Sequence, residues 1–201
     1  MNIEYHVSVN GCDRAEGSRE NPFRTISRAA AIAETGDRVI VHEGIYREWV
    51  KPAHTGYSNI SRITYEAAEG EKVVIKGSER IQNWEQTEGT VWKAVVPNTL
   101  FGDYNPYQEI LGGDWFLYPC ADGPEGYCIH TGDVYLNGKS FFEAKSLEDV
   151  KNPVIRTEGY NPPWTKRTEP ILHPEDTVYQ WYAQVDEENT TIYANFQIGR
   201  A

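Results

Sequence analysis

The chain has 201 residues with a formal net charge of −11, and 39% of its residues are hydrophobic. This length is enough for a sizeable core, in one large domain or two small ones. The acidic balance argues against nucleic-acid binding, because phosphate groups would be repelled. No apolar run approaches the roughly 18–20 residues that span a bilayer, which argues against a membrane protein.

The N-terminal residues lack the basic start and apolar centre of a secretory signal. Three cysteines, Cys12, Cys120 and Cys128, are an odd number, which fits a reducing compartment better than a disulfide framework. Neither their spacing nor any histidine cluster supplies the four ligands of a zinc site. We therefore expect a cytoplasmic protein with no metal site and no cofactor.

The first predicted elements are a strand and a short helix. Residues Glu4–Val9 alternate between polar and apolar, which predicts a strand with one covered face. After a polar segment, four apolar residues recur at helical spacing: Ile26, Ala29, Ala30 and Ala33. Thr25 is the expected N-cap and Gly36 the expected end of this helix. Its alanine stripe predicts close packing, as a lid over the open end of a sheet stack.

A buried strand is predicted at Val39-Ile40-Val41, which is too short for a helix and rich in β-branched residues. Two further runs are predicted as strands, Arg62–Glu66 and Lys72–Gly77. Ile63 follows Val39 by 24 positions, about one circuit of a β-solenoid whose stacked strands lie roughly 4.8 Å apart. This spacing predicts that the strand at Val39–Val41 and the strand that contains Ile63 are parallel neighbours.

From Ser78 onward the sequence is rich in Trp, Tyr and Pro, with short strands and turn signals. Asn137-Gly138 predicts a tight hairpin within Asp133–Phe142. A strand is predicted at Thr90–Val96, and a short helix at Ser146–Val150. A second hairpin is predicted from Val178–Val185 and Thr191–Phe196. These elements are typical of an antiparallel β-sandwich.

The sequence thus predicts a mainly β protein with two domains. Residues 1–77 are expected to form a capping helix and the first rungs of a parallel β-helix. Residues 78–201 are expected to form a β-sandwich-like domain. A stack of two circuits exposes an unpaired strand edge, which predicts association into a homo-oligomer.

Several stretches resemble known carbohydrate-active proteins. Residues 21–48, from Asn21-Pro22-Phe23 through Gly36-Asp37-Arg38 to Arg47-Glu48, resemble the N-terminal cap and first rung of right-handed parallel, pectin-lyase-like β-helices. A longer pattern resembles the β-xylosidases of glycoside hydrolase family 120 over essentially the whole chain. It comprises Trp49–Pro52, Ile63–Arg80, Gly132–Gly138 and Thr191–Phe196.

The resemblance implies a β-helix core interrupted by a β-sandwich, and retaining hydrolysis of xylo-oligosaccharides in xylan degradation. It also implies an Asp nucleophile and a Glu acid/base in later rungs, beyond residue 201. No residue of this chain is therefore assigned a catalytic role. The chain alone is expected to be inactive until those rungs are supplied.

A sugar-binding residue is predicted at Trp115, which follows the glycine pair Gly112-Gly113. Sugar C–H faces pack against indole rings, and glycines allow the backbone to approach a ligand. The resemblance implies that the matching Trp of the β-xylosidases lies at the sugar subsite. The alternative is that Trp115 belongs to the core of the sandwich.

Two other functions remain open at this point. One is a non-catalytic carbohydrate-binding or scaffold protein. The other is a polysaccharide lyase, which would need a Ca²⁺-binding carboxylate cluster and a base, although no dense Asp cluster is visible. Hydrolysis of an aryl β-xyloside would distinguish the β-xylosidase interpretation from these two alternatives. His42 and His54, near the first circuit, are interpreted as structural.

Overall fold

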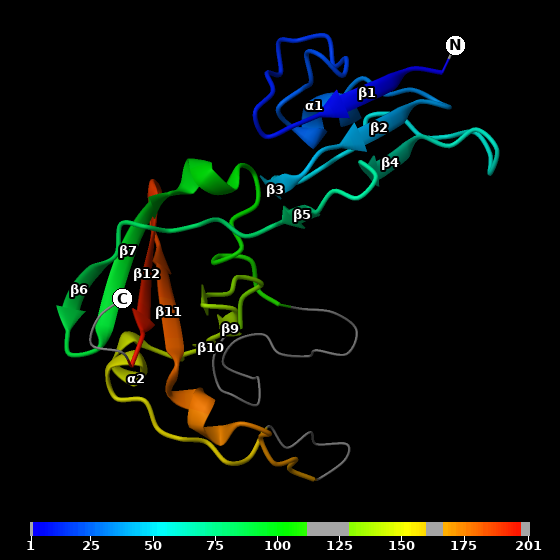
Figure 1. The fold of residues 1–201 in the computed structure, drawn as a ribbon. Helices are drawn as coiled ribbons and strands as arrows, with labels where there is room; N and C mark the ends of the chain where they lie inside the picture. The colour runs from blue at the N-terminus through cyan, green and yellow to red at the C-terminus, as the bar shows by residue number, and fades with distance from the viewer. Residues whose placement is uncertain (1, 112–128, 160–166, 198–201) are drawn as a thin grey trace. The chain divides into compact units, whose positions relative to one another are not determined.

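The computed structural model describes residues 2–111, 129–159 and 167–197. The chain is mainly β and divides into two compact units, residues 1–80 and 81–201 (Figure 1). Each unit has its own hydrophobic cores, so each is described by itself. Among the described residues, no helix is long and apolar enough to cross a membrane.

The first unit is built from parallel strands. A three-stranded sheet has the order β1-β2-β4, with strands Glu4–Val7, Arg38–Val41 and Thr64–Ala67. A two-stranded sheet pairs β3 with β5, which span Gly44–Arg47 and Val73–Lys76. All three residues of Val39-Ile40-Val41 are buried or nearly so, which confirms a strand covered on both faces.

The predicted parallel pairing of the second and third strands is confirmed, but the predicted spacing of 24 residues is wrong. Arg38 pairs with Thr64 and Val39 with Tyr65, a repeat of 26 residues. The repeat between β3 and β5 is longer, since Gly44 pairs with Val73. The corner after β4 has five residues and the corner after β2 has two, which accounts for the difference.

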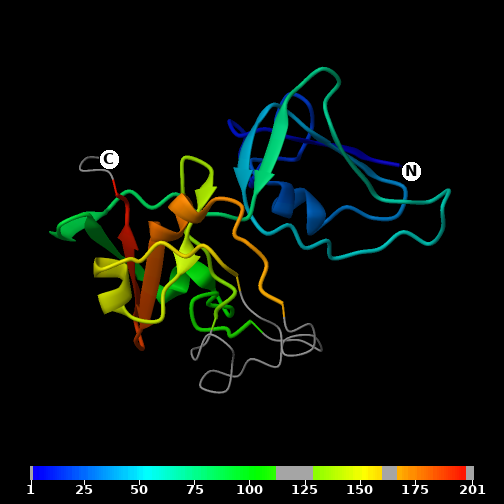
Figure 2. The ribbon, with the colours of Figure 1, turned by 90° about the horizontal axis from the view of Figure 1, so that it is seen from below.

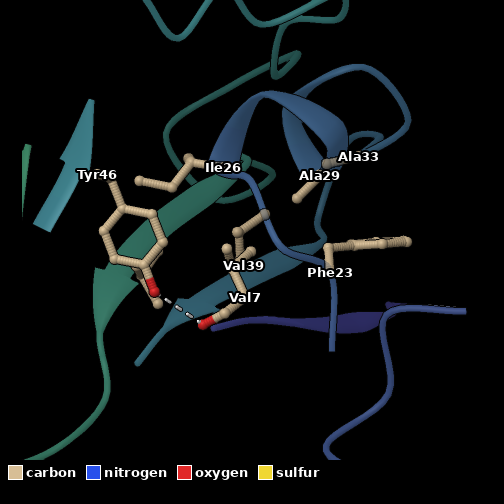
Figure 3. Close-up of a cluster of buried hydrophobic side chains, with 8 residues drawn as sticks. Val7, Phe23, Ile26, Ala29, Ala33, Val39 and Tyr46 are labelled. Carbon is tan, nitrogen blue, oxygen red and sulfur yellow. Dashed lines mark hydrogen bonds between the residues drawn. The ribbon is translucent and has the colours of Figure 1, made fainter. Parts of the chain in front are cut away.

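The core of the first unit lies between the strands and a short helix, α1 (Ile26–Ala30). Figure 3 shows Ile26, Ala29 and Phe23 facing Val7 and Val39 of the sheet. Ala29, Ala30 and Ala33 are fully buried, so the small side chains allow the close approach that the sequence predicts. Large residues in their place would overpack this contact.

The N-cap prediction for α1 is confirmed, because Thr25 Oγ1 accepts a hydrogen bond from the Arg28 backbone N–H. The helix is shorter than predicted and ends at Ala30, six positions before Gly36. The carbonyl of Ala30 accepts from the Ala53 N–H, and the Glu34 N–H donates to Asp37. These tertiary hydrogen bonds replace the bond that would continue the helix.

The second unit contains a five-stranded sheet in the order β10-β11-β12-β7-β6 and a two-stranded hairpin, β8-β9. The sheet strands are β6 (Glu85–Glu88), β7 (Val91–Pro97), β10 (Phe142–Glu143), β11 (Gln180–Val185) and β12 (Asn189–Asn195). The hairpin strands are Tyr135–Leu136 and Lys139–Ser140. The short helices are η1 (Asn98–Phe101), α2 (Leu147–Lys151) and η3 (Pro174–Val178).

Alternation along β7, β11 and β12 divides the sheet into two faces. On one face lie Trp181, Ile192 and Ala194, packed in a core that includes Phe141 and Phe196. On the other face, Tyr182 and Tyr193 pack with residues of α2, which contacts β11 and β12 (Figures 1 and 2). The period of two residues is what a sheet covered on both sides requires.

Both predicted hairpins are confirmed. Asn137 and Gly138 have φ of 53° and 83°, as a type I′ turn between β8 and β9 requires. Strands β11 and β12 pair antiparallel across the turn closed by Asp186 and Asn189. The short helix predicted near residue 146 is also confirmed as α2, with Ser146 as its N-cap.

The sandwich prediction needs correction for the part of the chain that the structure describes. There the second unit has one main sheet with a helix on one face, in place of two facing sheets. Strand β10 also pairs parallel to β11, whereas a purely antiparallel arrangement is predicted. Alternation reveals which residues share a face, but it does not fix the direction of a neighbouring strand.

Candidate functional site

Trp115, the predicted sugar-binding residue, falls in segment 112–128, outside the described residues. The described residues on each side of this segment are joined to one another. The Leu111 N–H donates to the Ile129 carbonyl at 2.7 Å, and the Thr131 N–H donates to the Glu109 carbonyl at 2.9 Å. Ile110 and His130 form an antiparallel bridge between these bonds. The two ends that carry the segment therefore lie side by side.

Glu143 on β10 anchors this pair of ends to the sheet. Its carboxylate accepts from the His130 backbone N–H at 2.8 Å and lies 2.5 Å from His130 Nδ1. The Glu143 side chain is only 9% exposed. A buried carboxylate without partners would cost several kcal/mol, so these hydrogen bonds favour the observed position of His130 strongly.

A second set of contacts joins the stretch before Glu109 to the stretch after His130. The Tyr107 hydroxyl donates to the Asp133 carbonyl at 2.9 Å, and the Gly132 N–H donates to the Pro106 carbonyl at 2.8 Å. A Cβ at Gly132 would lie 2.8 Å from the Tyr107 ring, so any larger residue would displace the ring. The ring of Tyr107 packs edge-on against Trp181, 5.4 Å between centroids.

The burial of Tyr107 has a measurable consequence. Desolvation, with a smaller contribution from the charge of Asp133, raises the pKa of Tyr107 to about 12. An unfolded tyrosine ionises near pH 10. The stability that Tyr107 contributes is therefore complete below about pH 10 and is lost as the pH rises towards about 12. We expect an ultraviolet absorbance titration to contain a late phenol ionisation near pH 12, and Tyr107→Phe to reduce its amplitude by one phenol. A titration unchanged by that substitution would contradict the assignment.

The described carboxylates at this site are held by donors of their own unit. Asp133 accepts from the Val134 N–H and the Ser140 hydroxyl, and Glu143 accepts from His130. His130 is 26% exposed on its side chain, and its Nε2 has no hydrogen-bond partner among the described residues. This arrangement fixes the described residues on both sides of segment 112–128 to the second unit. It does not itself assign an acid/base pair.

Three other groups of the first unit are Glu48 and the two histidines that the sequence interprets as structural, His42 and His54. Glu48 accepts from the Ile26 and Ser27 backbone N–H groups at 2.9 and 2.7 Å, and thus holds the first turn of α1. His42 lies 3.0 Å from His6, nitrogen to nitrogen. His54 is exposed. Within the described ranges, no group of three or more His, Cys, Asp or Glu side chains is arranged to hold a metal ion.

Sequence reasoning missed the Glu143–His130 pair and the contact between His6 and His42. The first pair joins residues 13 positions apart and the second joins residues 36 apart. No local pattern relates such residues. For His6 and His42, a signal exists only once the parallel register of β1 and β2 is known, because the register determines which side chains are neighbours.

Comparison with known proteins gives two family matches. The family described as "Glycoside hydrolase 120, insertion domain" matches residues 81–199. The family described as "Protein of unknown function (DUF1565)" matches residues 9–53. Since the first match covers more than half of the chain, the chain belongs to glycoside hydrolase family 120.

Two relatives support this assignment. A solved structure described as the complex of XylC with xylose is 54% identical, with a TM-score of 0.88 over 98% of this chain and 30% of that chain. The uncharacterized protein YwoF of Bacillus subtilis (strain 168) is 42% identical over 72 residues, 36% of this chain and 15% of that protein. The chain thus spans less than a third of the length of either relative.

Proposed function

We propose that this chain is the N-terminal part of a β-xylosidase that hydrolyses xylo-oligosaccharides with retention of configuration. The observation that carries the proposal is the 54% identity, over 98% of the chain, to a protein solved with xylose. The insertion-domain match over residues 81–199 supports the same enzyme family. The nucleophilic and acid/base carboxylates are proposed to lie downstream of residue 201, since the match covers only 30% of the XylC chain.

The proposed architecture assigns a role to each unit. Residues 1–77 provide the cap and first rungs of a right-handed parallel β-helix, and residues 78–201 are a domain inserted into it. The parallel order β1-β2-β4 and the parallel pair β3-β5 support the first assignment. Stacked parallel strands with corner residues between them are the repeating unit of a β-solenoid.

The proposed substrate contact is the indole of Trp115. Support comes from its surroundings in the sequence and from the joined ends at Leu111 and Ile129, which Glu143 and Tyr107 fix on the second unit. A sugar ring stacked on the indole would gain apolar contact. Neighbouring polar groups would form hydrogen bonds with the hydroxyl groups of the sugar.

The test uses the polypeptide encoded by the complete reading frame. Purified protein is expected to hydrolyse an aryl β-xyloside and to release the β-anomer of xylose first, as followed by proton NMR. Trp115→Ala is expected to raise KM roughly fivefold, because a stacked aromatic contact is worth about 1 kcal/mol. Trp49→Ala, at an indole that is 81% exposed on the first unit, is the matched control and should leave KM unchanged.

Each outcome of this test is decisive. A folded Trp115→Ala protein with unchanged KM and kcat would remove Trp115 from the substrate site and leave the enzyme assignment intact. Absence of hydrolysis by the complete wild-type protein, with xylobiose still bound, would replace the enzyme with a carbohydrate-binding protein. Loss of activity on chelation would instead favour a Ca²⁺-dependent lyase.

A further inference from the structure

Four ionisable side chains form a continuous hydrogen-bonded row on the first unit. Glu4 Oε1 lies 3.2 Å from His6 Nε2, and His6 Nδ1 lies 3.0 Å from His42 Nε2. His42 Nδ1 lies 3.1 Å from Glu71 Oε1. The two imidazole rings are stacked, with centroids 5.2 Å apart and planes 18° apart. Neither side chain of this pair is freely exposed, at 9% for His6 and 24% for His42.

The row joins successive circuits of the chain. Glu4 and His6 belong to β1, His42 follows β2 directly, and Glu71 lies in the corner before β5. In the parallel register, His6 pairs with Ile40 and Val7 with Val41. His42 therefore extends one step past the last paired residue, and its ring reaches diagonally to the ring of His6. The backbone pairing brings the two histidines together without any local sequence signal.

The geometry fixes the number of protons in the row. A ring nitrogen beside a carboxylate oxygen must carry a proton, because its lone pair would otherwise face a negative charge. The bonds to Glu4 and Glu71 therefore need one N–H each. The hydrogen bond between the ring nitrogens of His6 and His42 needs a third N–H. Two neutral imidazoles carry only two ring protons in total, so the fully bonded row contains one imidazolium.

Each terminal carboxylate also accepts a hydrogen bond from a donor outside the histidine pair. Hydrogen bonds from the Glu43 backbone N–H and then from His42 lower the pKa of Glu71 below its usual value. Glu4 Oε2 accepts from Arg38 Nη1 at 2.8 Å. A neutral carboxyl group is therefore not the source of the third proton.

We propose that Glu4, His6, His42 and Glu71 form a proton-binding clasp, in which the two imidazoles together hold three ring protons and join the first circuits of the fold. The clasp opens in two ways. Loss of the third proton leaves two nitrogen lone pairs facing each other, and a fourth proton sets two N–H groups against each other. This proposal does not depend on the enzymatic function of the complete protein.

The clasp has further charged and polar neighbours. Besides the two carboxylates, Arg38 bonds to Glu4 and to Glu66 on β4. The charge of Arg19 acts on Glu71 and lowers its pKa further, as the smallest contribution. From β3, the uncharged Tyr46 hydroxyl donates to the His42 carbonyl at 2.9 Å.

The first test counts protons directly. Nitrogen-15 NMR of the histidine rings in the 201-residue protein, near neutral pH, should show three protonated ring nitrogens shared between His6 and His42. His42→Gln should return His6 to an ordinary neutral ring with one proton. Two neutral rings in the wild-type protein, with two ring protons between them, would overturn the proposal.

The second test measures thermal unfolding against pH for wild type, His42→Gln and the control His54→Gln, whose side chain is exposed. We expect the loss in melting temperature caused by His42→Gln to pass through a maximum of roughly 3–5 °C, because charge-assisted hydrogen bonds are lost. The maximum should fall within the range from pH 5 to pH 9, with a smaller loss at both ends. The control should show no such maximum. A difference that changes in only one direction from pH 5 to pH 9 would contradict the clasp.

Discussion

Replacing Trp181 by alanine is expected to lower the free energy of unfolding of the second unit by about 3–5 kcal/mol. The Trp181 side chain is only 2% exposed. It extends from β11 into the core between one face of the sheet and the residues that cover that face. Its ring also meets Tyr107 edge-on. Removal would leave a cavity that the neighbouring strands cannot close. Denaturant unfolding followed by far-ultraviolet circular dichroism measures the change.

Two control variants separate cavity formation from the general effect of substitution. Trp181→Phe keeps an aromatic ring and should recover most of the lost stability. Leu172→Ala, at a side chain that is 87% exposed, should change it by less than about 0.5 kcal/mol. A loss below about 1 kcal/mol for Trp181→Ala would mean that this core is not closely packed in solution.

Replacing Asp37 by alanine is expected to destabilise the first unit by about 3 kcal/mol, because two hydrogen bonds to a buried charged group are lost. Asp37 is 3% exposed. Its carboxylate accepts from the Ile3 N–H and from the Glu34 N–H, each at 2.8 Å. It thereby holds the start of β1 and the end of the helical region against the start of β2.

The matched variant for this prediction is Asp37→Asn, which keeps the shape and one acceptor oxygen. It should cost less than Asp37→Ala, since one of the two backbone N–H groups stays paired. Thermal and denaturant unfolding of both variants give the comparison. Equal stability of Asp37→Ala and the wild type would show that water replaces the carboxylate at no cost.

Much of the local structure follows from short sequence signals. Val39-Ile40-Val41 becomes a buried strand because β-branched residues suit a pleated surface covered on both sides. Asn137-Gly138 forms the predicted hairpin, since both residues tolerate positive φ. Thr25 caps its helix as predicted, because its side-chain oxygen accepts from a backbone N–H three residues on, and Ser146 caps the second predicted helix in the same way.

Features that depend on distant partners were not predictable in the same way. The end of α1 is set by Ala53 and Asp37, neither of which belongs to the helical pattern. The parallel direction of β10 depends on the chain between it and β11, which includes η3. A pattern of side chains along one strand contains no information on either choice.

The candidate site shows the same division. Trp115 was predicted from its residue type, its neighbouring glycines and the family resemblance, and its role stays a prediction. The contact between Glu143 and His130 joins residues that are far apart in the sequence and lie on a strand and a connection. A buried Glu on a two-residue strand has no distinguishing sequence pattern, and only the folded chain reveals its partner.

The unequal corners of the first unit affect how this fold tolerates changes in length. The corner after β2 consists of His42 and Glu43, and the corner after β4 has three more residues and a turn at Gly70 with φ of 77°. That added length carries Glu71 back over the shorter corner. Insertions or deletions there would alter the contacts of Glu71 with His42 and with the Glu43 N–H, while the strands on both sides keep their pairing. Such positions are natural places for divergence among related proteins and for the attachment of engineered peptides.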